Sequence, residues 1–376
     1  MNFIRLLSAA LAVFIGATVS SYAGESLVYF GTYTGAKSQG IYVSRFDSVT
    51  GQLSAPELAA AIQNPSFLTV NPGATNLYAC GEMNNGGTVT AFSLDRATGK
   101  LALLNQQSSG GAGPCHVSVD ATGQCLLVAN YGSGSIAALP IRADGRLGAA
   151  VTVIQHHGSG VNLKRQAGPH AHFIAPSPDN RFALNCDLGL DKVFVYRLDP
   201  VAAKLTANDP PFALLAPGSG PRHLVFSRDG RFVYVISEMG GTITVFRYAA
   251  ANAAMTEVQT VSTLPKDFSG NNTAAEIALR PDGKFLYASN RGDDSIAVFA
   301  VNAKSGRLAL VGHEPVLGRT PRHFAMDPTG HWLLAENQAS DSVAVFTIDA
   351  RTGKLKPTGQ TITVGSPVCA VFVSEK

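Results

Sequence analysis

The sequence is poor in charge and in helical periodicity, and both deficits narrow the classes of protein to which it can belong. Charged residues make up 15% of its 376 residues, and the formal net charge is +3, whereas about 25% is usual for soluble proteins. No Lys/Arg run and no stripe of basic and aromatic residues occurs, so the sequence predicts no nucleic-acid partner. Beyond the first 23 residues no stretch sustains a helical apolar spacing, which predicts few helices.

Several signatures of catalysis, metal binding and cross-linking are also absent. No Gly-x-Ser-x-Gly elbow, Cys-x-x-Cys pair or His-Glu-x-x-His motif occurs, which argues against serine esterases of that type and against zinc sites. We therefore expect neither a metal nor a cofactor. The cysteines are odd in number, and each lies in an apolar run that is typical of a strand: Cys80, Cys115, Cys125, Cys186 and Cys369. This pattern predicts five buried thiols rather than a disulfide framework.

Glycine and proline, in contrast, are abundant and punctuate an internal repeat. The unit has a Pro-x-His-like start, an apolar strand, an Asp-Gly-like turn, a second strand, and a third strand followed by a Thr-Gly-Lys-Leu-like turn. Its clearest copy is Gly220–Tyr248, and successive units begin 46 to 55 residues apart, at Pro65, Pro114, Pro169, Pro221, Ala274, Pro321 and Pro367. This spacing accommodates four strands and their loops, which is one propeller blade.

The seventh unit is divided between the two ends of the chain. Residues 367–373 read as a single first strand, and the strands that it lacks are found at residues 27–32 and 40–47. Joining the two ends would close the ring and remove free sheet edges. The sequence therefore predicts an all-β, seven-bladed β-propeller over residues 24–376, closed by pairing of N- and C-terminal strands.

The first 23 residues have the pattern of a signal peptide. Arg5 precedes an apolar stretch at residues 6–19, and Ser21-Tyr22-Ala23 places small residues where a signal peptidase reads them. The apolar stretch is shorter than the ~20 residues of a spanning helix. We expect cleavage after Ala23, a periplasmic or secreted protein, and no membrane association after cleavage.

Polar residues collect at one predicted mouth of the propeller channel. In each unit the start of the first strand and the end of the second lie at the same end of one hairpin, so these positions form a ring. Five of the nine histidines fall in or beside the ring, together with several charged residues: His116, His170, His172, His223, His323, Arg222, Arg291, Arg322, Glu238 and Glu276. The sequence thus places candidate functional groups around a single opening.

Two interpretations apply to this ring. His116, His223 and His323 recur at one repeat position, so a structural role is as well supported as a functional one. The four that depart from the repeat favour function: His172, Arg222, Glu238 and Arg291. Oxygen-bearing side chains at Asn130, Asp187, Asn290 and Asn337 keep a calcium site open as an alternative.

Several motifs together resemble one known family. Residues 165–172 (Arg-Gln-Ala-Gly-Pro-His-Ala-His), 130–131 (Asn-Tyr), 220–223 (Gly-Pro-Arg-His) and 289–291 (Ser-Asn-Arg) resemble the seven-bladed lactonases. That family includes propeller-type 6-phosphogluconolactonases and fungal carboxy-muconate cyclases. The resemblance implies a catalytic set of His172, Arg222, Glu238 and Arg291. One departure is Ser237, where the family commonly has Asn before the Glu.

The leading hypothesis is a metal-independent lactonase, a carboxylic ester hydrolase that acts on a small sugar lactone or a related cyclic ester. Arg222 and Arg291 would stabilise negative charge on the carbonyl oxygen or hold an anionic group of the substrate. Glu238 would serve as general base and His172 as proton shuttle, with these roles interchangeable. Six further residues are expected to bind substrate: His116, His170, His223, Glu276, Arg322 and His323.

Two alternatives belong to other classes. In a muconate-type cycloisomerase the same arginines would hold carboxylates while a proton moves without net addition of water. In a non-catalytic, exported binding propeller, an apolar rim would replace a polar cavity, because fold alone does not determine function.

The signal-peptide assignment yields a direct test. When the full chain is expressed in a Gram-negative host, we expect a mature form that begins near Gly24 in the periplasm or medium. Edman sequencing of the exported protein reads this N-terminus. A membrane-bound form that still begins at Met1 would contradict the assignment.

Overall fold

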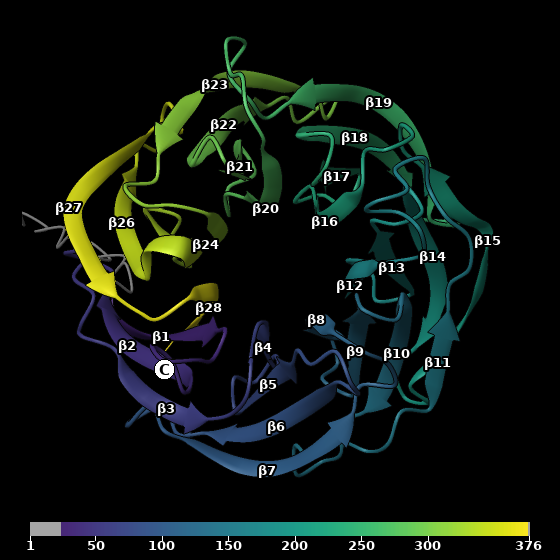
Figure 1. Cartoon of the computed structure of the whole chain (residues 1–376), viewed down its shortest axis with the longest axis horizontal. Helices are drawn as coiled ribbons and strands as arrows, with labels where there is room; N and C mark the ends of the chain where they lie inside the picture. Colours follow the sequence, from purple (N-terminus) through teal and green to yellow (C-terminus); the bar gives the residue numbers. More distant parts are fainter. Residues whose placement is uncertain (1–23, 375–376) are drawn as a thin grey trace, which may run out of the picture.

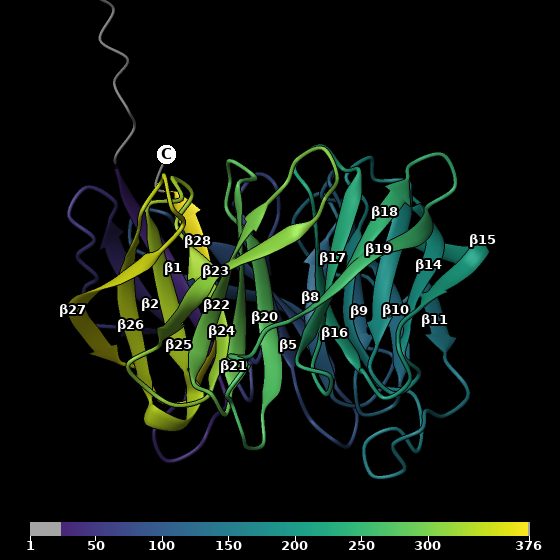
Figure 2. The same cartoon turned by 90° about the horizontal axis from the view of Figure 1, so that it is seen from above.

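The computed structural model describes residues 24–374 as a ring of seven four-stranded antiparallel sheets (Figure 1). The strands run roughly along the axis of the ring, between two faces formed by loops (Figure 2). The predicted all-β propeller is confirmed, and the one helical element in this part of the chain is the 3-10 turn η1 (Gln338–Ser340). The proposed signal peptide, residues 1–23, lies outside the described residues.

Six sheets are each built from four consecutive strands, of which the first lies nearest the axis of the ring and the fourth lies outermost. The first three are β4 (Leu68–Val70), β5 (Asn76–Gly81), β6 (Thr88–Leu94) and β7 (Leu101–Ser108); β8 (Pro114–Val119), β9 (Cys125–Asn130), β10 (Ser135–Pro140) and β11 (Thr152–Gln155); and β12 (Ala171–Pro176), β13 (Phe182–Asp187), β14 (Lys192–Asp199) and β15 (Lys204–Leu214). The next three are β16 (Pro221–Phe226), β17 (Phe232–Ser237), β18 (Thr242–Ala249) and β19 (Ala254–Ser262); β20 (Thr273–Leu279), β21 (Phe285–Arg291), β22 (Ser295–Val301) and β23 (Leu308–Pro315); and β24 (Pro321–Met326), β25 (Trp332–Asn337), β26 (Ser342–Ile348) and β27 (Leu355–Thr363).

The seventh sheet joins the two ends of the chain, as the split repeat predicts. Its order is β28 (Pro367–Ser374), β1 (Glu25–Thr32), β2 (Gly40–Asp47) and β3 (Glu57–Ala61). β28 is the innermost strand and pairs antiparallel with β1 from Ser26↔Ser374 to Thr32↔Pro367. In Figure 1 the yellow C-terminal strand lies against the purple N-terminal one. The ring is therefore closed by hydrogen bonds rather than by a covalent link.

The core lies between neighbouring blades. Every residue of the second strands β5, β9, β13 and β17 is buried, because both faces of these strands pack against other sheets. Tyrosines in three blades fasten one blade to the next by donating to a glycine carbonyl of its turn: Tyr29 to Gly99 at 3.0 Å, Tyr78 to Gly145 at 3.1 Å and Tyr287 to Gly353 at 2.8 Å. All five cysteines are buried free thiols, which confirms that prediction.

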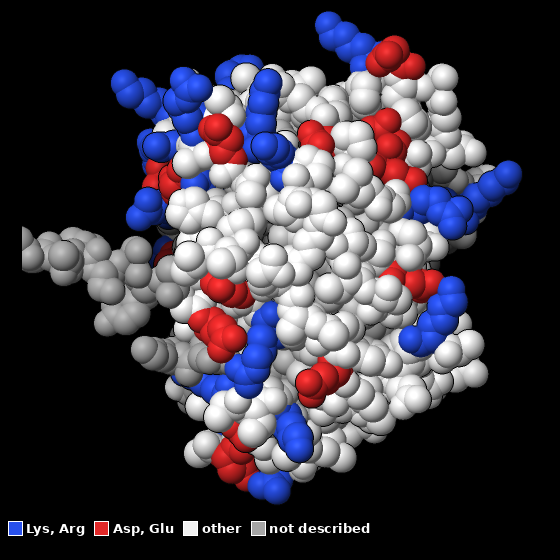
Figure 3. Space-filling view, turned by 90° about the vertical axis from the view of Figure 1, so that its left-hand side faces the viewer, with Lys and Arg blue, Asp and Glu red and all other residues white. Residues whose placement is uncertain are grey.

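On the side shown in Figure 3, basic and acidic side chains surround a broad uncharged area, and basic side chains are most frequent at the upper left. Within residues 24–374, no helix combines the length and apolarity needed to cross a bilayer.

The closing sheet leads to a stability prediction. Deletion of residues 367–376 removes β28, exposes the edge of β1 and opens the core that the closing blade shares with its neighbours. We expect the truncated chain to lose cooperative thermal unfolding, measured by circular dichroism. A truncated protein that melts near the full-length Tm would show that closure is dispensable.

Candidate active site

A polar cavity of about 400 Å³ lies where the innermost strands begin and the second strands end, the mouth that the sequence predicts. It is lined by Tyr33, Glu82, Cys115, Tyr131, Arg165, His172, Glu238, Thr273, Arg291 and Arg322. Three arginines and two glutamates in so small a space make it a site for a polar substrate. A polar cavity of this kind is what the enzyme hypotheses require, in contrast to the apolar rim of a binding scaffold.

β-Bulges aim the innermost residues into this cavity. Pairing between first and second strands shifts by one residue between Pro114 and His116, Ala171 and Phe173, Pro221 and His223, and Pro321 and His323. A bulge inserts an unpaired residue and changes the direction of its side chain. The inserted residues are Cys115, His172, Arg222 and Arg322, and all but Arg222 line the cavity. Two successive side chains per strand thereby reach the channel, at different depths.

Glu238 is held by three arginines. Its Oε1 lies 2.6 Å from Nη2 of Arg165, and its Oε2 lies 2.8 Å from Nη2 of Arg291 and 3.3 Å from Nε of Arg222. Arg222 lies behind Glu238, with 3% of its surface exposed, and donates to the carbonyl of Ala275 at 2.7 Å. Arg165 comes from the loop between β11 and β12, which projects at the lower edge of Figure 2.

These contacts fix the charge state of Glu238. Burial alone would raise its pKa, but Arg291, Arg222 and Arg165 together lower the pKa to about 2. Burial lowers the pKa of Arg222 to about 9, and Arg291 and Arg322 add to the effect. Glu238 is therefore ionised at neutral pH, and a carboxylate of such low basicity suits an anchor for arginines better than a general base.

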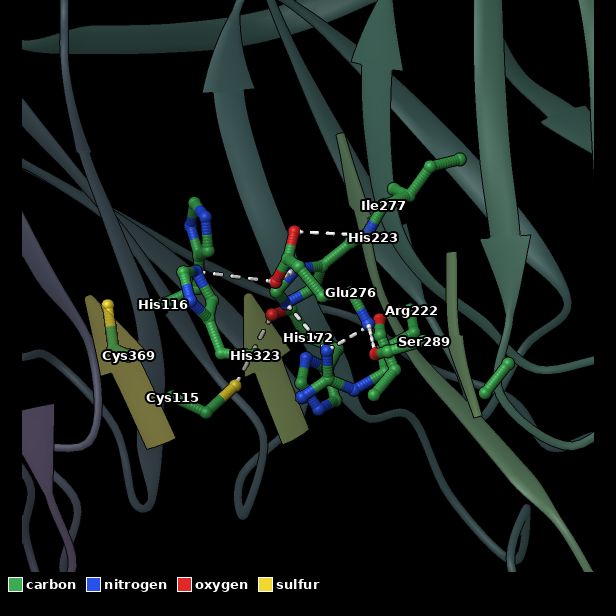
Figure 4. Close-up of polar contacts among 12 residues, drawn as sticks. Cys115, His116, His172, Arg222, His223, Glu276, Ile277, Ser289, His323 and Cys369 are labelled. Carbon is green, nitrogen blue, oxygen red and sulfur yellow. Dashed lines mark hydrogen bonds and ion pairs between the residues drawn. The ribbon is translucent and has the colours of Figure 1, made fainter. Parts of the chain in front are cut away.

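His172 enters the cavity as a neutral imidazole. Burial, reinforced by the nearby Arg222, holds its pKa well below the ordinary value. Its Nδ1 is buried without a hydrogen-bond partner among the described residues, and its ring meets Tyr131 edge to face at 5.5 Å. Figure 4 shows it beside Arg222 and Cys115. A neutral ring in this position can exchange hydrogen bonds with a substrate without adding positive charge.

A layer of packed rings closes the channel beneath the cavity. Ring centroids of Phe67 and His116 are 4.3 Å apart, those of His116 and Phe173 are 4.2 Å apart, and those of Phe173 and His223 are 5.2 Å apart. His323 meets Phe67 edge to face at 5.9 Å. Three of the predicted histidines therefore form a floor, which Figure 4 shows in part.

Two buried glutamates complete this floor. Oε2 of Glu276 lies 3.0 Å from Nδ1 of His223 and 3.6 Å from Nε2 of His323, whose Nδ1 lies 2.8 Å from Oε2 of Glu336. Burial raises the pKa of both glutamates and lowers the pKa of both histidines. Each of these four side chains thus has an ionisable neighbour within the channel filling.

The structure separates the predicted residues into two groups. Three of the four predicted catalytic residues line the cavity, and Arg222 stands directly behind them. Of the six predicted substrate-binding residues, Arg322 lines the cavity and five do not: His116, His170, His223, Glu276 and His323. His170 instead stacks on Tyr131 at 4.3 Å and contacts the Tyr131 carbonyl through Nδ1 at 2.9 Å. The sequence could not show how far along the channel each of these side chains lies.

The side chains considered for calcium contact loops or side chains nearby, and Oδ1 of Asn130 and of Asn337 accepts no hydrogen bond within residues 24–374. Asn130, Asn290 and Asn337 make the same contact in three blades, each donating Nδ2 to the carbonyl of a preceding loop at 2.8 to 3.1 Å. Asp187 lies 2.6 Å from Nδ1 of His156. Within residues 24–374, no group of three or more His, Cys, Asp or Glu residues is arranged to hold a metal ion.

Sequence reasoning missed several cavity residues. Glu82, Cys115 and Tyr131 occupy the aligned ring positions, so the repeat carried a signal for them. Arg165 belongs to the motif at residues 165–172, where the histidines drew attention instead. Tyr33 follows β1 outside the aligned positions, and only the closed ring brings it to the cavity.

Comparisons with known proteins show the family of the chain. The family model "Lactonase, 7-bladed beta-propeller" matches residues 27–372. A 6-phosphogluconolactonase of Bacillus subtilis is 38% identical over 79% of this chain and 83% of its own length, and one of Formosa agariphila is 34% identical over 79% and 85%. The solved structure of the periplasmic gluconolactonase PpgL of Pseudomonas aeruginosa superposes with a TM-score of 0.89, at 38% identity over 94% of this chain and 100% of that one.

The two central arginines should differ in their effect on stability. Arg222→Ala removes a buried partner of Glu238 and leaves the Ala275 carbonyl unbonded, which typically costs about 3–5 kcal/mol. Arg322→Ala removes a cation that makes no ion pair within residues 24–374, so its cost should be smaller. Thermal melts of both variants measure the difference. An equal or larger fall in Tm for Arg322→Ala would contradict the buried-anchor role of Arg222.

Proposed function

Because the chain belongs to the lactonase family of seven-bladed β-propellers, we propose that it opens the ring ester of a sugar lactone, or of a related cyclic ester, in this cavity. The predicted enzyme class, a carboxylic ester hydrolase of 6-phosphogluconolactonase type, is confirmed by the family and by the named relatives. The observation that supports the location is the grouping of three cavity-lining arginines, Arg165, Arg291 and Arg322, around two glutamates.

The arginines match the charge that develops during lactone hydrolysis. Attack of water on the carbonyl carbon places negative charge on the carbonyl oxygen, and fixed cationic donors lower the energy of that state. Arg291 is fixed by Glu238 at 2.8 Å and by the carbonyl of Ala274 at 3.1 Å. We assign Arg291 to the carbonyl oxygen, Glu238 and Arg222 to holding it in place, and His172 to a neutral hydrogen bond with the substrate.

Arg322 supports recognition of a polar or anionic substituent. Its guanidinium lies 5.3 Å from the ring centroid of Tyr33, and no carboxylate within residues 24–374 pairs with it. An arginine without a carboxylate partner can grip a phosphate or carboxylate bidentately. The relatives include both a 6-phosphogluconolactonase and a gluconolactonase. An assay must therefore compare a lactone that carries a phosphate with one that does not.

We also propose that the protein acts outside the cytoplasm. The support is the signal-peptide pattern at residues 1–23, together with the relative from Pseudomonas aeruginosa, which is described as periplasmic. The propeller, residues 24–376, would then be the mature domain.

An activity screen tests the proposed function. Mature protein is incubated with δ-gluconolactone and 6-phosphogluconolactone, and acid release is followed at constant pH with and without EDTA. We expect hydrolysis well above the spontaneous rate for at least one lactone, unaffected by EDTA because arginines supply the positive charge. Glu238→Gln should reduce kcat/KM about 100-fold or more by releasing the arginines.

Two outcomes would count against this proposal. Absence of catalysis on sugar lactones together with cyclisation of a muconate would favour the cycloisomerase alternative. Activity that disappears with EDTA and returns with calcium would show that a metal performs the role assigned to the arginines.

A further inference from the structure

The two carboxylates of the cavity, Glu82 and Glu238, have opposite environments. Glu238 is surrounded by three arginines and contributes to holding them. Glu82 lines the same cavity, and no Lys, Arg or His within residues 24–374 forms an ion pair with it. In the described part of the chain its one side-chain hydrogen-bond partner is the hydroxyl of Tyr33, which donates to Oε2 at 2.9 Å. Glu82 is thus the cavity carboxylate whose side chain meets a neutral donor instead of cations.

A network of hydrogen bonds around Asn64 holds the segments that carry Tyr33 and Glu82 next to each other. Asn64 exchanges backbone and side-chain bonds with Glu82, since Glu82 N donates to Asn64 O at 3.0 Å and Asn64 Nδ2 donates to Glu82 O at 3.2 Å. Asn64 Oδ1 also accepts from the backbone N and the hydroxyl of Thr34, both at 2.9 Å. One residue therefore fixes the segment after β1 against the end of β5, so that the phenol reaches the carboxylate.

Tyr33 is suited to position the carboxylate without competing for its proton. Burial raises the pKa of Tyr33, so the phenol stays protonated and continues to donate. Its ring faces Arg322, which fixes the other side of the phenol. A base that a second group orients is the usual arrangement in enzymes that activate a nucleophile.

His172 is a poorer candidate for this role. A proton on its ring would add a cation beside Arg222, and its Nδ1 has no acceptor within the described residues to orient the ring. The remaining cavity groups are arginines, tyrosines, a threonine and a buried thiol. By elimination and by geometry, Glu82 is the best-placed proton acceptor.

We propose that Glu82 is the general base of the reaction and that Tyr33 is its positioning residue, an assignment that rests on the proposed lactonase function. Glu82 accepts a proton from water as the water oxygen bonds to the lactone carbonyl carbon. The bond from that carbon to the ring oxygen then breaks, and the ring oxygen takes the proton from Glu82 to become a hydroxyl. Water is consumed, Glu82 returns to its carboxylate form, and the hydroxy acid ionises in solution.

The first test removes the base with little change in shape. Glu82→Gln should lower kcat about 100- to 10,000-fold with a much smaller change in KM, and its Tm should remain near that of the wild type. The matched control is Glu57→Gln, which neutralises an exposed carboxylate on the outer strand β3 and should keep full activity. Near-wild-type kcat in Glu82→Gln would overturn the assignment.

Chemical rescue separates a base from a structural carboxylate. Glu82→Ala opens space beside Tyr33, and added formate should restore part of kcat in a concentration-dependent way. The same formate should not rescue Glu238→Ala, whose loss disorders three arginines. Rescue of Glu238→Ala but not of Glu82→Ala would show that the roles of the two glutamates are reversed.

The positioning role of Tyr33 has its own readout. Tyr33→Phe removes the bond that favours the carboxylate over the carboxylic acid, so the acidic limb of the pH–kcat/KM profile should move to higher pH. An unchanged limb would contradict positioning through this bond. If the wild-type protein hydrolyses no lactone, the proposed function fails. If it does and Glu82→Gln is unimpaired, only the assignment of the base fails.

Discussion

The pairing of β28 with β1 is the constraint on which the cavity depends. It converts a row of seven sheets into a ring, and only in a ring do all innermost strands begin around one opening. The same pairing sets the end of β1 beside the start of β24, which brings the Tyr33 ring to Arg322. A closing contact made of main-chain hydrogen bonds thus has a direct consequence for chemistry, since residues from opposite ends of the chain meet in the site.

The innermost strands leave a central space that side chains fill. The bulges place the two residues at the start of a strand at different depths in this space. The inserted residue of each bulge reaches the cavity layer, whereas the next residue, such as His116 or His223, packs into the floor. The floor surrounds the cavity with packed rings of low polarity, an environment in which electrostatic interactions are stronger than in water. The three arginines around Glu238 repel one another because all carry positive charge. The carboxylate of Glu238 lies among them and offsets that repulsion.

The repeat was sufficient to predict the fold, the split blade and the mouth that holds the site, because blade length and turn residues are local properties of the sequence. It also identified His172, Glu238 and Arg291 as departures from the pattern, and all three line the cavity. The repeat could not predict which ring residues line the cavity and which lie deeper in the channel. That difference depends on which residue of each first strand is inserted as a bulge, and the alternation of apolar and polar residues does not reveal it. Nor could the repeat find Tyr33, which lies outside the aligned positions and meets Arg322 only because the ring closes.

Glu82 and Glu238 show how one repeat position acquires two chemistries. Each directly follows the second strand of its blade, so the backbone presents both to the same cavity. Their difference arises from neighbours that the repeat does not encode: a long loop supplies Arg165 to one, and the first turn of the chain supplies Tyr33 to the other. Three arginines lower the pKa of Glu238, whereas the side chain of Glu82 contacts one neutral phenol. A symmetric scaffold can in this way place two carboxylates with different neighbours around a single cavity.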